Sequence, residues 1–585
     1  MKHILVLFAL LWPLTIQAQS LSWGIADTLS HHSIGPGVFF TELIYPEKPL
    51  AIYITTVDLT NPHNLIESYP SNGKVPDASG QTTSAQCKDN TTEAHRVVMG
   101  INHDFFDING GVAIGTNIRN GEMTHNGEWQ NGKLMNRAVL TIDDTKRANI
   151  LNPVYFMNII FPDQKKMEIE MVNDRSDDLH QTKKVVLYNR FNSKELKTPG
   201  TYATIKPLDI WTFNGDPIRC IVESTGQNPI QPNSEQYVLR LLDDAAVEFT
   251  SKATTGDTIR IEQLLRAISW GAHTPNILQA FHGYPSIIRR GELHAGEYDN
   301  FENSATWPNG RAYEVANRTM AGISRDGRTL FLVVVDGRRP GWSIGLNCIE
   351  TALFMVELGA YHVVNFDGGG SSTMVVNEEV KNKPTDSSGE RKVMNTLQVI
   401  SNAPVNPTPH TVSFRRTSIL MQKYSSIQLE YFVYNQHGDP ISTHEGILFS
   451  MTPGLKGTIT QKGELYVNEA SEGYVIATIG DNADSIYVKV NDTNTSIEEK
   501  LNSFFSCYPS IVENGTTIRY TVNQPSYITL SLYDFMGKRI ETFVSNFHTP
   551  GTYEYSFIRT GQKAGIYFLL YQSDSRSNTL KLIFR

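Results

Sequence analysis

The feature that most constrains the fold of this 585-residue chain is the apolar run Thr329–Val335. A strand in which polar and apolar residues do not alternate is typical of a sheet that is buried on both faces. Residues 346–358 then place apolar side chains at the spacing of one helix stripe, and Tyr361–Phe366 has the pattern of a second strand. This order predicts a strand–helix–strand unit whose two strands are parallel. It therefore predicts an α+β domain with a mixed sheet over residues 19–402.

Both predicted strands end in an acidic residue followed by glycine, Asp336 in one case and Asp367 in the other. Ligands of parallel α/β sheets bind in the crevice at the carboxyl ends of the strands, so we expect the two acids to lie together. The loop 368–372 contains three consecutive glycines, which allow the backbone to approach a ligand and offer N–H groups to an anion. Arg338 beside it fits phosphate recognition. The alternative interpretations are that these glycines only form turns and that Arg338 is a solvated surface residue.

A serine motif lies between the first strand and the helix. Residues 341–345 match the G-x-S-x-G pattern of serine hydrolases, with Ser343 at the centre. In those enzymes the serine stands on the tight turn between strand and helix, whereas here residues 337–341 intervene. A serine hydrolase using Ser343 is therefore the least favoured hypothesis. Ser343 is instead a candidate N-cap of the helix, and Gly359 follows its last turn.

Composition divides the chain into further segments. Residues 1–18 combine a basic residue, an apolar run and a small-residue cleavage signal, which predicts a secretory signal peptide. No other stretch has the length and apolarity expected of a transmembrane segment. The Pro-rich stretch Asn402–Pro409 and the polar stretch Asn491–Ser496 are predicted linkers. The segments that they delimit, 410–490 and 505–585, have period-2 strand patterns, so two small all-β sandwich domains are expected after the α+β domain.

Charge and cysteine content exclude several classes of protein. The chain has 60 acidic against 51 basic residues, a formal charge of −9, which argues against a nucleic-acid-binding protein. Its 4 cysteines, with no C-x-x-C pair, argue against a disulfide-framework protein and against structural zinc.

Several motifs of residues 37–400 resemble, in their order and spacing, the phosphodiester glycosidase family, whose members remove a sugar such as N-acetylglucosamine from a phosphodiester. The motifs are Asn102-x-Asp104-Phe-Phe-Asp107, Arg318-Thr-x-Ala-Gly322, Asp336-Gly-Arg338, Ser343-x-Gly345, Glu350, Asn365-Phe-Asp-Gly-Gly-Gly-Ser-Ser-Thr-Met374 and Arg391-x-Val393-x-Asn395. The main departure is His103, where many relatives have glycine. It either adds a titratable group or fills space.

The resemblance implies a hydrolase that cleaves a sugar-1-phosphodiester, of N-acetylglucosamine or a related α-linked sugar, and releases the sugar and a phosphomonoester. Glycosidases commonly use paired carboxyl groups. The candidates here are Asp104, Asp336, Asp367 and Glu350, and which aspartate is nucleophile or base stays open. The residues implied to bind substrate and phosphate are Asn102, Arg318, Arg338, Ser343, Gly368, Gly369, Gly370, Ser371, Ser372, Arg391 and Asn395. No cofactor is required, and a divalent cation such as Ca²⁺ among the carboxylates stays open.

The two β segments also resemble known families. Residues 410–490, with turns at Gly454–Gly457 and Thr458–Gly463, resemble a bacterial Ig-like domain. Residues 505–585, with Thr517–Tyr520, resemble the C-terminal sorting domain of type IX secretion cargo in Gram-negative bacteria. That resemblance implies an exported protein, at the cell surface or outside the cell, with the secretion machinery as a partner. The alternative from another class is a surface glycan-binding protein whose enzyme-like domain only holds ligand, although the intact Asp and Arg positions favour an enzyme.

Overall fold

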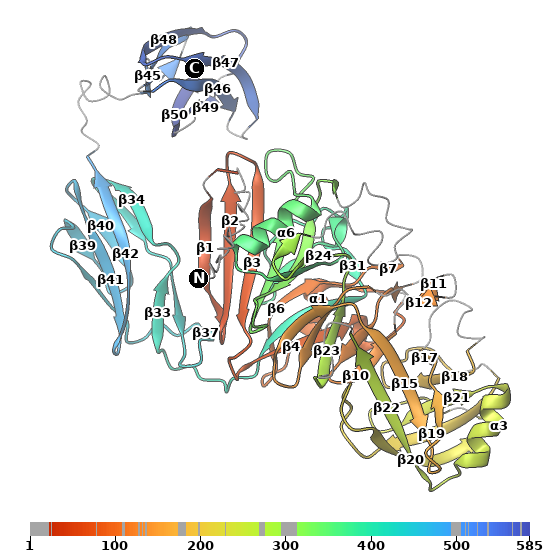
Figure 1. Cartoon of the computed structure of the whole chain (residues 1–585). Helices are drawn as coiled ribbons and strands as arrows, with labels where there is room; N and C mark the ends of the chain where they lie inside the picture. The colour runs from red at the N-terminus through yellow and green to blue at the C-terminus, as the bar shows by residue number, and fades with distance from the viewer. Residues whose placement is uncertain are drawn as a thin grey trace, which may run out of the picture. The chain divides into compact units, whose positions relative to one another are not determined.

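The structure is a computed structural model of the chain (Figure 1). It describes residues 23–584 except 25, 78, 108–110, 127–128, 131–132, 135–136, 174–182, 197–198, 229, 268–274, 294–312, 493–504, 509–510, 513, 523, 535–537, 564 and 574–575. The predicted signal peptide, residues 1–18, lies outside the described residues. The chain forms two compact units, one comprising the residues up to Thr408 together with Tyr434–Thr443, the other Pro409–Val433 together with the chain from His444.

The first unit is built on an eight-stranded sheet in which every pair of neighbouring strands is antiparallel. Its strands, in spatial order, are β1 (Asp27–Gly35), β2 (Val38–Tyr45), β3 (Leu50–Asp58), β27 (Thr329–Val335), β26 (Arg318–Ile323), β28 (His362–Asn365), β24 (Ser286–Arg289) and β25 (Glu292–Leu293).

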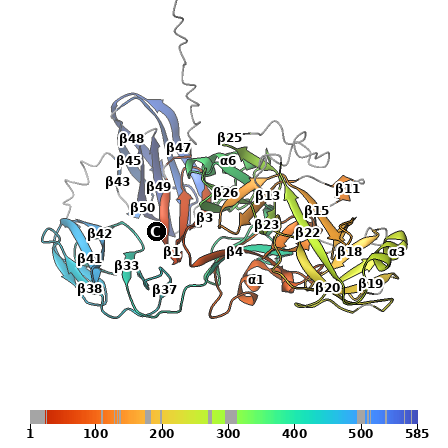
Figure 2. The same cartoon turned by 60° about the horizontal axis from the view of Figure 1, so that its bottom comes forward.

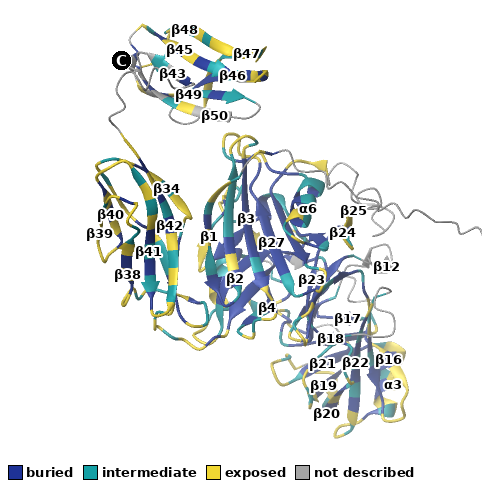
Figure 3. Ribbon diagram, turned by 60° about the vertical axis from the view of Figure 1, so that its left-hand side comes forward, coloured by how far each residue is buried: buried dark blue, intermediate teal, exposed yellow. Residues whose placement is uncertain are grey.

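Both faces of this central sheet are covered. Helix α6 (Cys348–Glu357) packs on one face, where Val333 and Met355 belong to one apolar cluster. A five-stranded sheet packs on the other face, where Leu332 and Val399 belong to a second cluster. Figure 3 shows the central strands as mostly buried. The five strands are β30 (Glu379–Val380), β29 (Met374–Val376), β6 (Arg96–Asn102), β32 (Asn395–Ser401) and β4 (Asn64–Pro70).

Two further sheets belong to the first unit (Figure 2). Side chains of both sheets form one apolar core. One contains β10 (Glu122–His125), β9 (Asn117–Arg119), β23 (Ile277–His282), β13 (Val139–Asp143) and β14 (Ala148–Leu151). The other contains β16 (Lys166–Glu168), β15 (Val154–Ile160), β22 (Thr258–Arg266), β20 (Ile218–Gly226), β19 (Thr201–Pro207), β21 (Tyr237–Leu241), β18 (Val185–Tyr188) and β17 (Met171–Val172). Helix α3 (Asp243–Lys252) packs against this second sheet through Phe249.

Other elements that the structure describes in the first unit are short. They are helix α1 (Thr83–Asp89), the 3₁₀ turns η1 (Ser71–Gly73) and η3 (Gly369–Ser371), and the strand pairs β5 (Gln81–Thr82) with β31 (Lys392–Val393), β7 (Phe106–Asp107) with β8 (Val112–Ala113), and β11 (Trp129–Gln130) with β12 (Lys133–Leu134).

The described residues beyond Pro409 form strands. The first group comprises the sheet β34 (Ser418–Gln422), β42 (Asn482–Asn491), β41 (Ser471–Ile479) and β38 (Leu448–Met451), the sheet β35 (Ser425–Gln428), β40 (Glu464–Val467) and β39 (Gly457–Ile459), and the strands β33 (Thr411–Phe414), β36 (Tyr431–Tyr434) and β37 (Pro440–Ile441). The second group comprises the sheet β43 (Phe505–Tyr508), β45 (Gly515–Val522) and β48 (Gly551–Ile558), and the sheet β44 (Ile511–Val512), β50 (Arg576–Phe584), β49 (Gly565–Ser573), β46 (Ser526–Asp534) and β47 (Arg539–His548).

The predicted fold class, an α+β domain with a mixed sheet, is wrong. The structure is 55% strand and 7% helix, with three α-helices in the part of the chain that it describes. β27 and β28 do run in the same direction, but β26 lies between them and is antiparallel to both. The apolar run of β27 misled the prediction because layers cover both faces of an antiparallel sheet here, as they would in a parallel one.

The helix between these strands also differs from the prediction at its start. Its N-cap is Asn347 rather than Ser343, and Asn347 forms a reciprocal capping box with Glu350. Its end agrees with the sequence pattern, because Gly359 follows with φ +105°, a left-handed conformation that favours glycine. None of the helices in the described residues has the length and apolarity needed to cross a lipid bilayer.

Candidate active site

The ends of β27 and β28 and the start of β26 meet at one edge of the central sheet. In the strand register Arg318, the first residue of β26, pairs with Val335, and Met320 pairs with Asn365. Asp336 follows β27 directly and Asp367 follows β28 by two residues. The topology therefore places these acids at the same edge as Arg318.

Arginine side chains lie near all three consecutive glycines. A β-carbon placed on Gly368 would meet the main-chain oxygen of Asn317 at 2.9 Å and would lie 3.9 Å from Nη1 of Arg318. One on Gly369 would lie 3.4 Å from Nη1 of Arg338, and one on Gly370 would overlap Nη2 of Arg391. Gly369 also has φ +60°, the left-handed region that favours glycine. A loop without side chains thus allows three guanidinium groups to gather around its backbone, which is the composition of an anion site.

The three arginines are held by other groups of the chain. Nη2 of Arg338 donates to the Glu314 carboxylate at 2.7 Å, and Nε of Arg391 donates to that of Asp386 at 2.7 Å. Arg318 is buried, and its Nε donates to a main-chain oxygen of the loop before α6 at 3.1 Å. Because their charges are oriented before any ligand binds, less ordering entropy is lost on binding.

Asp367 lies at the start of the glycine loop and is partly buried. Its N–H donates to the main-chain oxygen of His103 at 2.8 Å. Burial raises the pKa of its carboxyl group to about 6, against the opposing effects of a hydrogen bond from Ser371 and the charge of Arg391, while the charge of Asp104 adds to the rise. A carboxyl group with such a pKa changes its protonation state near neutral pH, as an acid–base group must.

Asn102 fixes both ends of the loop. Its Nδ2 donates to the main-chain oxygen of Asp367 at 2.6 Å, and its Oδ1 accepts from the Thr373 N–H at 3.1 Å. Ser371 and Ser372 between them are buried, and the Ser372 hydroxyl has no hydrogen-bond partner among the described residues. Asn102 is therefore a positioning group for the loop.

Asp104 is buried and accepts from several donors. His282 Nδ1 lies 2.6 Å from its Oδ1, and Asn117 Nδ2 donates to its Oδ2 at 2.7 Å. Burial alone would raise the pKa of Asp104, but the charge and hydrogen bond of His282 lower it below its ordinary value. Asn395 accepts the Asp104 N–H at 3.2 Å and so orients the same residue.

The sequence analysis did not single out His282. It is the last residue of β23 and directly precedes the sequence Gly283-Tyr-Pro285. A polar residue at a strand end beside such a motif was the available signal.

His103 fills space rather than adding a charge. It is fully buried, with its ring centroid 5.5 Å from that of Phe281 and 5.7 Å from that of Phe366. Burial lowers its pKa to about 4, although Asp104 acts in the opposite direction. The ring is therefore neutral at neutral pH.

Asp336 is fully buried, and other side chains and a main-chain N–H surround its carboxylate. Trp342 Nε1 donates to it at 2.9 Å, Asn382 Nδ2 at 3.1 Å and the Lys383 N–H at 3.0 Å. Burial raises its pKa although these hydrogen bonds oppose the rise. Asn382 also donates to the Ser372 main-chain oxygen at 3.0 Å, so Asp336 supports the glycine loop through Asn382.

Ser343 and Glu350 are engaged near the start of α6. The buried Ser343 hydroxyl donates to the Asp336 main-chain oxygen at 2.7 Å and accepts from the Ala51 N–H at 3.1 Å. Glu350 caps the helix and pairs with Lys48 at 2.8 Å. A hydroxyl held by two main-chain groups is not arranged as a nucleophile, which needs a base within hydrogen-bonding reach.

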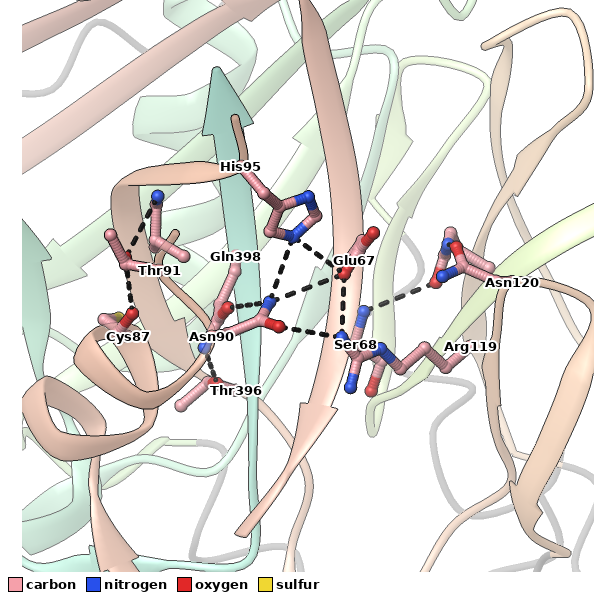
Figure 4. Close-up of polar contacts among 12 residues, drawn as sticks. Glu67, Ser68, Cys87, Asn90, Thr91, His95, Arg119, Asn120, Thr396 and Gln398 are labelled. Carbon is pink, nitrogen blue, oxygen red and sulfur yellow. Dashed lines mark hydrogen bonds and ion pairs between the residues drawn. The ribbon is translucent and has the colours of Figure 1, made fainter. Parts of the chain in front are cut away.

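A second buried polar network lies around Glu67 on β4 (Figure 4). Its Oε2 lies 3.4 Å from His95 Nε2 and 3.1 Å from Arg119 Nη2. In the same network, Asn90 Nδ2 donates to Gln398 Oε1 at 2.8 Å. Burial would raise the pKa of Glu67, but the His95 hydrogen bond and the Arg119 charge lower it to about 2. The network ties β4 and β32 to β9.

The described residues contain no group of three or more His, Cys, Asp or Glu side chains placed to hold a metal ion.

Comparisons with known proteins concern part of this chain. Residues 212–400 match the family model described as phosphodiester glycosidase. The mouse enzyme N-acetylglucosamine-1-phosphodiester alpha-N-acetylglucosaminidase is 32% identical over 113 residues, 19% of this chain and 21% of the mouse protein. The human enzyme is 31% identical over the same coverage, so the chain matches only about a fifth of the length of these curated relatives.

Solved structures similar to this chain include a hypothetical protein from Synechocystis, with 12% identity, 62% coverage of both chains and a TM-score of 0.44. They also include the catalytic domain of the zebrafish N-acetylglucosamine-1-phosphodiester alpha-N-acetylglucosaminidase, auto-inhibited by its pro-peptide, with 14% identity and a TM-score of 0.33. The comparison covers 64% of this chain and 87% of the zebrafish domain. Asp367, the glycine loop and its three arginines all lie within the range matched by the family model, whereas Asn102 and Asp104 precede it. Residues 212–400 thus form a region similar to the phosphodiester glycosidases.

Proposed function

We propose that the edge of the central sheet around the glycine loop is the active site of a hydrolase that cleaves sugar-1-phosphodiesters. The observation that carries this proposal is the gathering of three guanidinium groups around a side-chain-free loop, directly beside Asp367. A phosphodiester bears a negative charge on several oxygens, and arginine meets such oxygens with paired N–H donors. Cleavage releases the sugar and a phosphomonoester, whose developing charge the arginines stabilise.

Two carboxyl groups near this loop have pKa values that differ in opposite directions from the ordinary value. The pKa of Asp367 is raised to about 6 and that of Asp104 is lowered. Carboxyl groups separated in this way are typical of sites where one group exchanges a proton and the other stays ionised. In this proposal Asp367 faces the anomeric carbon and Asp104 remains a carboxylate.

The proposed sugar is N-acetylglucosamine or a related α-linked sugar. The support is the name of the curated relatives, which specifies an N-acetylglucosamine 1-phosphodiester and an α linkage.

The test is release of free sugar from N-acetylglucosamine α-1-(methyl phosphate) by the purified chain. Methyl α-N-acetylglucosaminide, which lacks the phosphate, is the matched control substrate. We expect turnover of the diester, little turnover of the glycoside, and loss of diester turnover in Asp367→Asn. Binding of both compounds without turnover would contradict the proposal and favour the glycan-binding alternative.

We further propose that the protein is exported and delivered to the cell surface or the medium of a Gram-negative bacterium. The support is the signal-peptide pattern of residues 1–18 and the sorting-type sequence of residues 505–585. Deletion of residues 505–585 should leave an active enzyme in the periplasm of the native host. Normal surface delivery of the truncated protein would contradict this assignment.

A further inference from the structure

His282 and Asp104 form a buried pair of fixed geometry. His282 Nδ1 lies 2.6 Å from Asp104 Oδ1. The other carboxylate oxygen accepts from Asn117 Nδ2 at 2.7 Å and from the Gly115 N–H at 3.1 Å. Both carboxylate oxygens of Asp104 are therefore occupied by protein donors, which makes Asp104 a poor direct proton acceptor and a good support for the imidazole ring.

The other nitrogen of the His282 ring is available. The side chain is only 3% exposed, and Nε2 has no hydrogen-bond partner among the residues that the structure describes. Gly115 lies directly against the ring, since a β-carbon there would overlap it. A buried polar nitrogen without a partner costs free energy, and a bound water or substrate group offsets that cost.

The chain beside the pair contacts β28, the strand that leads to Asp367. Gly283, which follows His282, packs on the main chain of β28, where a β-carbon would meet the Asn365 oxygen at 2.7 Å. The N–H of Tyr284 donates to that same oxygen at 2.7 Å. Asp104 in turn raises the pKa of Asp367 through its charge. The main chain that follows His282 is thus attached to the strand that leads to Asp367 and the glycine loop.

We propose that Nε2 of His282 is the base that takes a proton from the attacking water, and that Asp104 is the positioning residue for the ring. This inference rests on the proposed function. As the bond from the water oxygen to the anomeric carbon forms, the bond from that carbon to the phosphate oxygen breaks. The electron pair leaves on the phosphomonoester, which the arginines hold, and the water proton passes to Nε2. The ring then returns the proton to solvent, so that water is the only co-reactant.

The assignment agrees with the tautomer that the pair requires. An ionised Asp104 accepts the Nδ1 proton, so Nε2 is the nitrogen that gains or loses a proton in the reaction. The ionisable groups next to the ring are Asp104 and the neutral His103, with the amide of Asn117 and the N–H of Gly115 completing the surroundings of Asp104.

The first test is kinetic and uses His282→Gln, which retains a hydrogen-bond donor toward Asp104 but has no basic nitrogen. General base catalysis contributes about 10²- to 10⁴-fold, so we expect kcat on N-acetylglucosamine α-1-(methyl phosphate) to fall at least about 100-fold with little change in KM. The acid limb of the kcat–pH profile should disappear. Asp104→Asn should lower kcat about 10- to 100-fold and displace that limb.

The matched control is His362→Gln. His362 is a partly buried histidine whose Nδ1 likewise lacks a partner among the described residues, but it begins β28, whereas Asp367 follows the end of that strand. This variant should retain wild-type kcat and pH profile.

A second measurement tests the proposal even if the kinetic variants do not fold. Selective ¹⁵N-histidine labelling of the full chain, assigned with His282→Asn, should show that the neutral form of the His282 ring carries its proton on Nδ1. A proton on Nε2 of the neutral ring would overturn the proposal. So would wild-type kcat and pH profile in His282→Gln, and in that case the proposed function would stand. If the wild-type chain hydrolyses no sugar-1-phosphodiester, the proposed function itself fails and the role of His282 fails with it.

Discussion

The guanidinium group of Arg391 occupies the space that a β-carbon on Gly370 would need. Arg391 is held there by the Asp386 carboxylate at 2.7 Å, and its Nη1 reaches the Ser371 hydroxyl at 3.4 Å. A cation is thereby placed directly against the backbone of the loop. Position 370 requires glycine because the Arg391 guanidinium leaves no room for a side chain. The backbone conformation does not require it, since φ of Gly370 is not in the left-handed region.

Gly370→Ala should therefore displace Arg391 and lower kcat/KM for the sugar-1-phosphodiester by about tenfold or more, the contribution of one charge-assisted hydrogen bond. The melting temperature should change little, because the overlap is with the end of a flexible side chain. Steady-state kinetics and thermal unfolding measure the two effects. Gly226→Ala is the control, because a β-carbon there meets no atom within 4 Å. Wild-type kinetics in Gly370→Ala would show that the position of Arg391 is irrelevant to the reaction.

Replacement of Arg318, Arg338 or Arg391 by lysine should lower kcat/KM by about 10- to 100-fold each. Lysine keeps the charge but loses the planar fork that meets two phosphate oxygens at once. Arg219→Lys is the control, because Arg219 forms a comparable paired contact with Asp209, at 2.8 and 3.0 Å, on the surface. Competition by inorganic phosphate should weaken in the three loop variants only. Unchanged phosphate competition in all three would place the anion elsewhere.

Asp367→Asn should abolish hydrolysis and stabilise the fold at high pH. The folded-state pKa of about 6 lies above the ordinary value of 3.8, so the wild-type protein loses stability as the pH rises from about 4 to 6, and the loss persists above that range. Asparagine carries no charge and escapes this loss. We expect the variant to exceed wild type by about 1 to 3 kcal/mol in free energy of unfolding at pH 8, and to match it near pH 4. Urea unfolding at both pH values measures the difference, and equal stabilities at pH 8 would contradict the raised pKa.

Glu67→Gln should have the opposite pH dependence. The folded-state pKa of Glu67, about 2, lies below its ordinary value of 4.5. Its ionisation therefore stabilises the protein above about pH 4.5, and that stabilisation is lost as the pH falls towards 2. The variant should be about 3 kcal/mol less stable than wild type at pH 7, with a smaller difference at pH 3. Glu379→Gln, which alters only the exposed pair with Lys381, should change stability little. A pH-independent difference would show that Glu67 acts through packing alone.

The sequence was sufficient to predict local features of the site. The order of strand, helix and strand between Thr329 and Phe366 predicted two strands of the same direction, and the residues after them predicted Asp336 and Asp367 at one edge. Three adjacent glycines predicted a backbone that approaches a ligand, and this stays a prediction; the structure places Arg338 near Gly369. These features follow from local chain chemistry, because strand direction and glycine freedom depend on neighbouring residues.

Only the tertiary structure decided which strands are neighbours and which polar groups meet. Nothing in residues 329–366 indicates that β26 inserts between β27 and β28, and this insertion turns a predicted mixed sheet into an antiparallel one. Likewise Asp104 and His282 are 178 residues apart in the chain and 2.6 Å apart in space. Asp336 and Asp367 are both acids that follow a strand and precede a glycine. Asp336 accepts hydrogen bonds from Trp342 and Lys383, whereas Asp367 is influenced by the charge of Arg391. Burial and long-range contacts set the charge and the role of such groups, and both arise only when distant segments pack together.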